Sequence, residues 1–178
     1  MEYVYLLAGL PRLRLTDPPA LTSAGLLAAM DGVARPDHRE AVRAILEGRH
    51  DDVRHAEARR YLDADTQLRN ALARLRARRA GSEYDAGAHA HEGYDLRCES
   101  TAAHAAGLPD PLARELALDR FRWGLLDEIA TMPAFGVQAL FAYAFKLRLS
   151  EKWAAMSDER GLELTDEIVE RELAGKVP

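Results

Sequence analysis

The longest apolar stretch of this sequence covers residues 134–153 and reads AFGVQALFAYAFKLRLSEKW, with Lys146 inside it. A membrane-spanning helix needs about 20 predominantly apolar residues, whereas this run ends at Phe145, where charged side chains begin. Placed on a helix, its large apolar side chains surround the axis, and a helix that is apolar on all sides belongs in a protein core. We therefore expect residues 134–153 to form the central helix of a helical domain.

The rest of the composition also favours helix. Alanine, leucine, arginine and glutamate dominate the 178 residues, and β-branched residues are scarce, a balance typical of helical proteins. The sequence predicts an all-α fold, one elongated helical domain over residues 1–178. The net charge of −5 argues against a general nucleic-acid binder. The single cysteine, Cys98, fits a reducing compartment, and the start of the chain does not resemble a signal peptide, so we expect a cytoplasmic protein.

Cap and stop signals divide the chain into helices and connections. Asp37 with Glu40 forms a capping-box pattern before a helix that Gly48 ends, and Asp110 with Pro111 starts another. Residues 2–8 are too short for periodicity to distinguish strand from helix. The predicted helices cover residues 23–31, 37–47, 51–81, 96–106, 110–132, 134–153 and 165–174, residues 10–22 form a proline-rich loop, and 82–109 is a loop-rich connection.

Lys146 needs a partner if it lies in a core helix, because a buried ammonium group is costly unless it is paired. An antiparallel hairpin centred on residues 132 and 133 places residues whose numbers sum to about 265 opposite each other. Asp119 then faces Lys146, and we predict an ion pair between them that fixes the register of the hairpin. In the long helix 51–81, we expect Asp65 to pair with Arg69 at i, i+4.

Four potential zinc ligands lie within a short segment of the loop-rich connection, namely His89, His91, Cys98 and His104. A glycine-rich backbone could fold them around a metal. Their spacing matches no zinc module, since paired CxxC or HxxxH ligands are absent, and a solvated loop with incidental histidines is the favoured interpretation. We identify no phosphate-binding loop and no paired acid and base, and so predict no catalytic residue and no cofactor.

The long helix carries a run of basic residues that starts at Arg69 and includes Arg74 and Arg76. These arginines could form a solvated helix face, a surface that docks on an acidic protein, or a nucleic-acid contact. Aromatic residues for base stacking are not interleaved with them, which makes the third reading the weakest.

Four segments carry a family resemblance: YVYLLAGLPRL, DPPALTSAGLL, LRNALARLRA, and DRFRWGLLDEIATMPAFGVQALFAYAFKLRLSEKW. In this order they resemble a bacterial family of small uncharacterised proteins encoded among the subunits of V/A-type ATPases. That family is distantly similar to the ATPase C subunit (d in eukaryotes), a helical socket between the central stalk and the membrane ring. The positions that carry the resemblance are Tyr3, Tyr5, Leu10, Pro11, Pro18, Pro19, Arg69, Asn70, Arg76, Asp119, Trp123, Asp127, Phe135, Tyr143, Lys146, Leu147 and Trp153.

The resemblance implies a C-subunit-like fold and a non-catalytic subunit or assembly factor of a V/A-type ATPase. Its partners would be the central stalk and the membrane ring, with Arg69, Asn70, Arg74 and Arg76 as contact candidates. The protein would then lie on the cytoplasmic face of the membrane, held there only through its partners. Two alternatives from other classes are a metal-dependent enzyme that uses the histidine-rich loop and a helical nucleic-acid-binding adapter.

Overall fold

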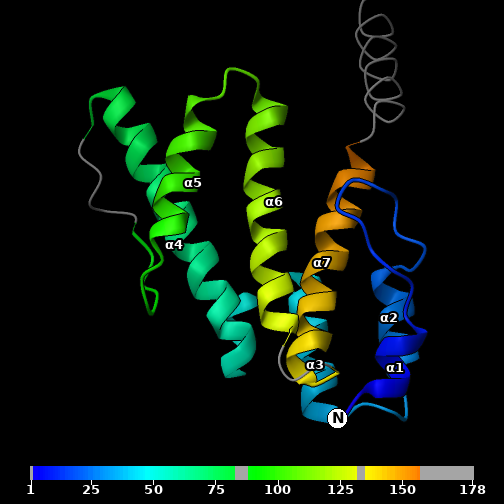
Figure 1. Ribbon diagram of the computed structural model, residues 1–178. Helices are drawn as coiled ribbons and strands as arrows, with labels where there is room; N and C mark the ends of the chain where they lie inside the picture. The colour runs from blue at the N-terminus through cyan, green and yellow to red at the C-terminus, as the bar shows by residue number, and fades with distance from the viewer. Residues whose placement is uncertain (1, 83–87, 132–134, 157–178) are drawn as a thin grey trace, which may run out of the picture.

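The computed structural model describes residues 2–82, 88–131 and 135–156 of the chain. Within these ranges every regular element is a helix, which confirms the predicted all-α fold, a single helical domain (Figure 1). The elements are α1 (Val4–Gly9), α2 (Ser23–Ala29), α3 (Pro36–Glu47), a 3₁₀ turn η1 (His50–Asp52), α4 (Ala56–Ala80), α5 (Leu96–Gly107), α6 (Pro111–Ala130) and α7 (Val137–Ala155). None of them is long and apolar enough to cross a bilayer. The helix predicted for residues 165–174 lies outside the described ranges.

Local signals account for most of the helix boundaries. Asp110 caps α6 by accepting hydrogen bonds from the backbone N–H groups of Leu112 and Ala113, as its position before a proline predicts. Gly48 ends α3 with a φ of 77°, in the left-handed region that favours glycine. Residues 4–9 form the short helix α1, which settles the choice between strand and helix.

Two predicted helix starts are wrong. Arg35, not Asp37, is the N-cap residue of α3, because Pro36 occupies the first helical position and Asp37 lies in the first turn. The Asp37 carboxylate accepts hydrogen bonds from the Arg35 guanidinium, so the predicted capping box with Glu40 does not form. The long helix α4 begins at Ala56 rather than near residue 51, because the 3₁₀ turn and an extended Val53 precede it.

Helix α7 is the central helix, as the apolar stretch predicts. It packs against α2, α3, α4 and α6, and Leu140, Phe141, Ala144, Phe145 and Leu147 are all buried. These side chains belong to a first core cluster that also takes in α1, α2, α3, the first part of α4 and the end of α6. A smaller second core cluster joins the rest of α4 to α5 and the start of α6, through Leu68, Ala71, Leu72, Cys98, Ala102, Ala105 and Leu118.

The loop of residues 10–22 is fastened to α7 by hydrogen bonds between residues far apart in the sequence. Tyr143 Oη donates to the carbonyl of Pro11 at 2.8 Å, and Ser150 Oγ donates to the carbonyl of Arg14 at 2.8 Å. The Glu151 carboxylate accepts from both the backbone N–H and the hydroxyl of Ser23, each at 2.7 Å. The negative charge of this carboxylate also interacts favourably with the positive end of the α2 dipole.

The predicted ion pair between Asp119 and Lys146 is wrong, although α6 and α7 are neighbours (Figure 1). Lys152 contacts both Asp119 and Glu115, and Lys146 contacts Asp127 at 2.5 Å, so the numbers of facing residues sum to between 267 and 273 rather than to 265. Part of the difference arises because α7 begins only at Val137. The rest follows from the tilt of helical side chains toward the helix N-terminus, which directs the lysines of α7 toward the end of α6.

Asp119 is the centre of a buried polar network between α4, α6 and α7. Its side chain is 0% exposed, and it accepts hydrogen bonds from Arg122 at 2.8 Å, Lys152 at 2.6 Å and the Trp153 indole at 2.9 Å. Arg122 also donates to Asp65 on α4 at 2.7 Å. Burial acts to lower the pKa of Arg122, but the nearby carboxylates outweigh it and raise that pKa, so the guanidinium stays charged.

Two pairs at the edges of this network differ in exposure. Asp65 also forms the predicted pair with Arg69, at 3.1 Å. Asp127 is 63% exposed where it meets Lys146, and the Lys146 ammonium lies 5.0 Å from the centre of the Trp123 ring. Asp119 and Asp127, two of the α6 carboxylates that pair with lysines of α7, therefore lie in opposite environments, the first enclosed and the second largely exposed.

This contrast predicts different costs for the same substitution. Asp119→Ala removes the enclosed carboxylate shared by Arg122, Lys152 and Trp153. Arg122 keeps Asp65 and Lys152 keeps Glu115, so the free energy of unfolding should fall by about 3 kcal/mol, the lower end of the range for breaking a buried pair. Asp127→Ala removes an exposed carboxylate and should cost no more than about 1 kcal/mol. Urea denaturation of both variants beside the wild type measures the difference. Equal costs would show that Asp119 does not hold the network together.

Candidate functional site

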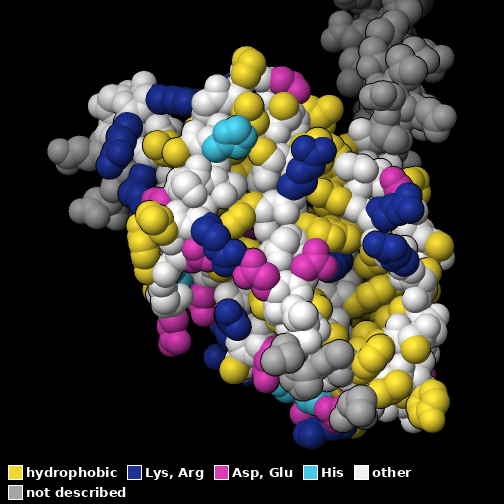
Figure 2. Space-filling model, in the orientation of Figure 1, with side chains coloured by type: hydrophobic (Ala, Val, Ile, Leu, Met, Phe, Trp, Pro, Cys, Tyr) yellow, Lys and Arg dark blue, Asp and Glu magenta, His cyan; other side chains and the backbone are white. Residues whose placement is uncertain are grey.

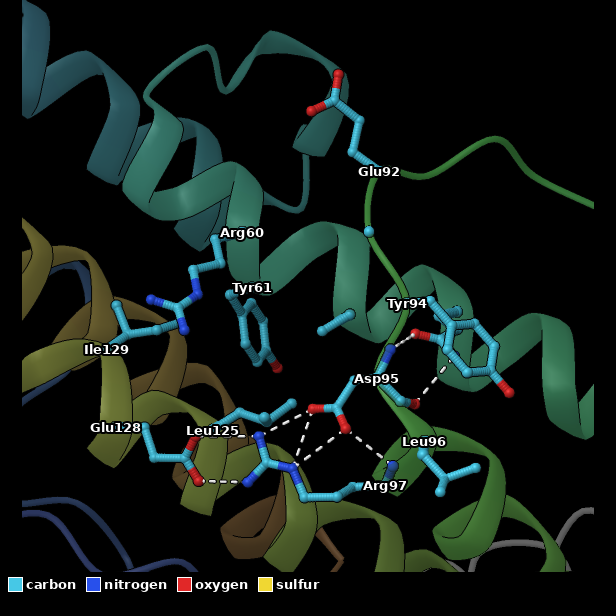
Figure 3. A pocket seen from close by; sticks show the side chains of 13 residues that line it. Arg60, Tyr61, Glu92, Tyr94, Asp95, Leu96, Arg97, Leu125, Glu128 and Ile129 are labelled. Carbon is cyan, nitrogen blue, oxygen red and sulfur yellow. Dashed lines mark hydrogen bonds and ion pairs between the residues drawn. The ribbon is translucent and has the colours of Figure 1, made fainter.

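A pocket of about 340 Å³ opens between α4, α6 and the segment that leads into α5. Figure 3 shows Tyr61 and Leu125 inside it, with charged side chains at its rim. Its lining residues are Arg60, Tyr61, Ala64, Gln67, Glu92, Gly93, Tyr94, Asp95, Leu96, Arg97, Leu125, Glu128 and Ile129. Burial raises the pKa of Tyr61 well above its ordinary value, so the pocket presents a neutral phenol.

Two buried amide side chains of α4 hold the segment that borders this pocket. Gln67 accepts from the backbone N–H of Asp95 at 2.8 Å and donates to its carbonyl at 3.0 Å. Asn70 does the same for His89, donating at 2.7 Å and accepting at 3.1 Å. Residues three apart on a helix share a face, so these amides act as paired clamps, much as a neighbouring strand would. We call Gln67 and Asn70 the amide clamp.

The segment held by the amide clamp carries two large side chains that are exposed to solvent. Gly93 has a φ of 75°, a conformation that glycine adopts readily, and Tyr94 follows it directly. Tyr94 and Leu96 are each 70% exposed, one on either side of the clamped Asp95. We call Tyr94, Leu96 and the pocket beside them the Tyr94 surface.

Charged groups at the rim of the Tyr94 surface are fixed in position. The Arg97 guanidinium lies between Asp95, at 2.8 Å, and Glu128 on α6, at 2.6 Å (Figure 3). Its hydrogen bonds hold the pKa of both carboxyl groups below their usual values, so all three groups are charged near neutral pH. Exposed ion pairs contribute little to stability. These pairs instead fix the position of the start of α5 relative to α6 on the two sides of the pocket.

The side chains of the Tyr94 surface are of types that are common at binding surfaces. Tyrosine and arginine are enriched where proteins bind one another, and a rigid backbone lowers the entropy lost when a partner docks. Over the face drawn in Figure 2, acidic and basic side chains are interspersed rather than gathered into one large area of a single sign. That distribution suits selective contact with a protein better than contact with a uniformly charged polymer.

The structure does not bring together the four candidate metal ligands, which are absent from the metal-ligand cluster found among the described residues. Cys98 is buried in the second core cluster, with its Sγ 3.4 Å from the carbonyl of Ala64, whereas His89 and His104 are exposed and His91 is only partly buried. Burial raises the pKa of the Cys98 thiol to about 11, which favours the uncharged form over the thiolate that binds metals. Proximity in the sequence does not bring these candidates together, because Cys98 points into the core while His89 and His104 are at the surface.

The four predicted partner-contact residues, all on α4, lie in different environments. Asn70 is buried and belongs to the amide clamp, so it is not a surface contact. Arg69 pairs with Asp65 and Arg74 with Glu99 at 2.7 Å, each at the surface. Arg76 lines a separate pocket with Arg79 and Arg114. The role of the three arginines in binding a partner stays a prediction.

The Tyr94 surface was not identified from the sequence, although part of its signal is present. Asp95 caps α5 by accepting from the N–H of Arg97, which is the start signal of the helix predicted from residue 96. A glycine and a tyrosine stand directly before that cap. What the sequence does not show is that Gln67 and Glu128, far away in the chain, fix this segment beside a pocket.

Comparison with known proteins adds one finding. Residues 101–175 match the model of a family described as a protein of unknown function, DUF2764. No curated protein and no solved structure matches the chain. The match supports the coarser part of the predicted resemblance, an uncharacterised family, over α6, α7 and most of α5. The likeness to the ATPase C subunit stays a prediction.

The amide clamp makes a prediction at the level of single amides. Gln67→Ala should speed hydrogen exchange at the N–H of Asp95, which then lacks its acceptor, and leave the N–H of His89 protected. Asn70→Ala should do the reverse. Each loss strands partly buried backbone groups, at a cost of about 1–3 kcal/mol. Exchange followed by NMR distinguishes the two, and uniform acceleration in either variant would contradict separate clamps.

Cys98 gives a second prediction. Because burial holds its thiol protonated, alkylation by iodoacetamide at pH 8 should be slow in the native protein. Unfolding in urea exposes the thiol and returns its pKa to about 8.5, so the rate should rise by at least about 100-fold, with rates followed by mass spectrometry. A fast native reaction would contradict the buried position.

Proposed function

We propose that this protein is a non-catalytic helical subunit or assembly protein of a V/A-type ATPase. It docks on the central stalk through the Tyr94 surface and lies at the cytoplasmic face of the membrane through that contact. The observation that carries the proposal is the rigid display of Tyr94 and Leu96, each 70% exposed, at the edge of a pocket. The class of partner comes from the sequence resemblance, and the binding surface comes from the geometry.

The geometry supports binding for energetic reasons. A few large side chains at the centre of an interface carry most of the binding free energy, and tyrosine is among the commonest of them. Tyr94 and Leu96 lose little backbone freedom on docking because the amide clamp already fixes the residue between them. The ion pairs of Arg97 with Asp95 and Glu128 surround them with charges that orient a partner.

The segment matched by the family model contributes directly to this surface. Residues 101–175 include α6, which supplies Leu125, Glu128 and Ile129 to the pocket. The Tyr94 segment and α4 lie before the matched residues. A docking role therefore predicts that both parts of the chain act together, since one side of the pocket comes from each.

The proposal is tested by affinity purification of the tagged protein from the cells that make it, at low salt, with detergent-solubilised membranes. We expect ATPase catalytic and central-stalk subunits to be recovered in stoichiometric amounts with the wild type. The double substitution Tyr94→Ala with Leu96→Ala should reduce that recovery by at least about tenfold, since a central tyrosine contributes 2 kcal/mol or more at many interfaces.

Tyr5→Ala provides a matched control, because Tyr5 is an equally large side chain that is 94% exposed on α1, away from the pocket. It should leave recovery unchanged. Thermal unfolding of all variants should agree within a few degrees, since exposed side chains are removed. Recovery of the wild type without ATPase subunits would refute the assignment to this complex. Equal losses for Tyr5 and for the double variant would refute the Tyr94 surface as the contact.

A further inference from the structure

Three potential metal ligands from two helix starts lie together, outside the Tyr94 surface. Asp37 and His38 belong to the first turn of α3, and His55 is the residue before α4. One ligand atom from each lies within 4.8 Å of the other two. Nε2 of His38 is 3.8 Å from Oδ2 of Asp37. Tetrahedral zinc, with bonds of about 2.0–2.2 Å, holds its ligand atoms about 3.3 Å apart, so small side-chain rotations bring these atoms to bonding positions.

His38 has a polar partner on the ring nitrogen that faces away from Asp37. Its Nδ1 lies 2.6 Å from the hydroxyl of Tyr3, and the side chain is only 7% exposed. A histidine that binds a metal through one nitrogen almost always donates the hydrogen on its other nitrogen to a carboxylate, a backbone carbonyl or water, which fixes the ring, and the oxygen of the Tyr3 hydroxyl can accept that hydrogen in the same way. With the hydrogen on Nδ1, the lone pair of Nε2 is available on the side where Asp37 lies.

The two imidazole rings are also held by packing. The ring of Phe141 on α7 lies 6.0 Å from that of His38 and 5.1 Å from that of His55, measured between centroids. The two histidine rings are 5.1 Å apart. Rigid ligands lose little conformational entropy when a metal binds. Asp37 is exposed, so an ion can reach the cluster from solvent.

We propose that Asp37, His38 and His55 form a binding site for a divalent transition metal such as zinc. Two imidazoles and one carboxylate are ligands that zinc prefers, and three protein ligands leave a fourth position for water. The bound ion would join the start of α3 to the start of α4, with Tyr3 from the N-terminal segment supporting it. This site is independent of docking through the Tyr94 surface.

Two positively charged features near the site disfavour the binding of a cation. The starts of α3 and α4 carry partial positive charge, which disfavours a cation; the carboxylates of Asp37 and Glu2, the latter 3.8 Å from His38, offset it. Arg35 also holds the Asp37 carboxylate, through hydrogen bonds of 3.0 and 3.1 Å. A metal must displace or share with this guanidinium. Arg35→Ala should therefore tighten metal binding.

The test is isothermal titration of the full chain with zinc chloride, together with the visible absorption of bound cobalt(II) as a report on imidazole ligation. The wild type should bind one equivalent of zinc. Asp37→Asn and His55→Ala should each lose this stoichiometric binding, and both residues are accessible enough for the variants to fold. Tyr3→Phe keeps the ligands but removes the support of His38, and should weaken binding by about 10–100-fold.

His104→Ala is the matched control, since this exposed histidine of α5 lies outside the cluster and should not alter zinc affinity. Circular dichroism verifies that each variant is folded. The proposal is overturned if the wild type binds no stoichiometric zinc. It is equally overturned if binding survives in Asp37→Asn and His55→Ala while the double variant His89→Ala with His91→Ala loses it, because the ion would then sit in the loop.

Discussion

The buried carboxylate of Asp119 is the interaction on which the arrangement of the longest helices depends. A charge with no exposed surface is tolerated only when donors surround it, and Asp119 takes its donors from its own helix and from α7. Arg122 extends the network to Asp65 of α4. The geometry of three helices is thereby coupled, since shifting one past another would strand at least one buried charge. Apolar packing alone tolerates such shifts more readily.

This network lies where the two core clusters meet. Ala64 and Phe121 pack against both clusters, close in sequence to Asp65 and Arg122, so α4 and α6 each pass from one cluster into the other. On one side, α7 is enclosed by aromatic and aliphatic side chains. On the other side, small residues of α5 pack against α4. The segment before α5 is held to α4 by the hydrogen bonds of the amide clamp. The Tyr94 surface forms over this second side.

Most features encoded within a few residues could be predicted from the sequence, although the starts of α3 and α4 could not. The start of α6 is set by Asp110 and Pro111, and the apolar side chains on all sides of α7 identify it as a core helix. Features that depend on distant residues could not. The register of α6 against α7 depends on where α7 begins and on the direction of lysine side chains, neither of which residue counting includes. The same holds for both sites: Gln67 reaches Asp95, and His38 meets His55, only because the chain has folded.

The hydrogen bonds that fasten the loop of residues 10–22 to α7 have a consequence for the order of assembly during synthesis. Pro11, Arg14 and Ser23 leave the ribosome long before Tyr143, Ser150 and Glu151, their partners. The apolar faces of α2 and α3, with Leu26, Val42 and Ile45 fully buried in the finished protein, lack their contacts with α7 until that helix emerges. Apolar surface that stays exposed during synthesis makes the chain prone to aggregation and is bound by chaperones. During synthesis, the cluster that contains α1, α2 and α3 is therefore completed after the second core cluster, because it must wait for α7.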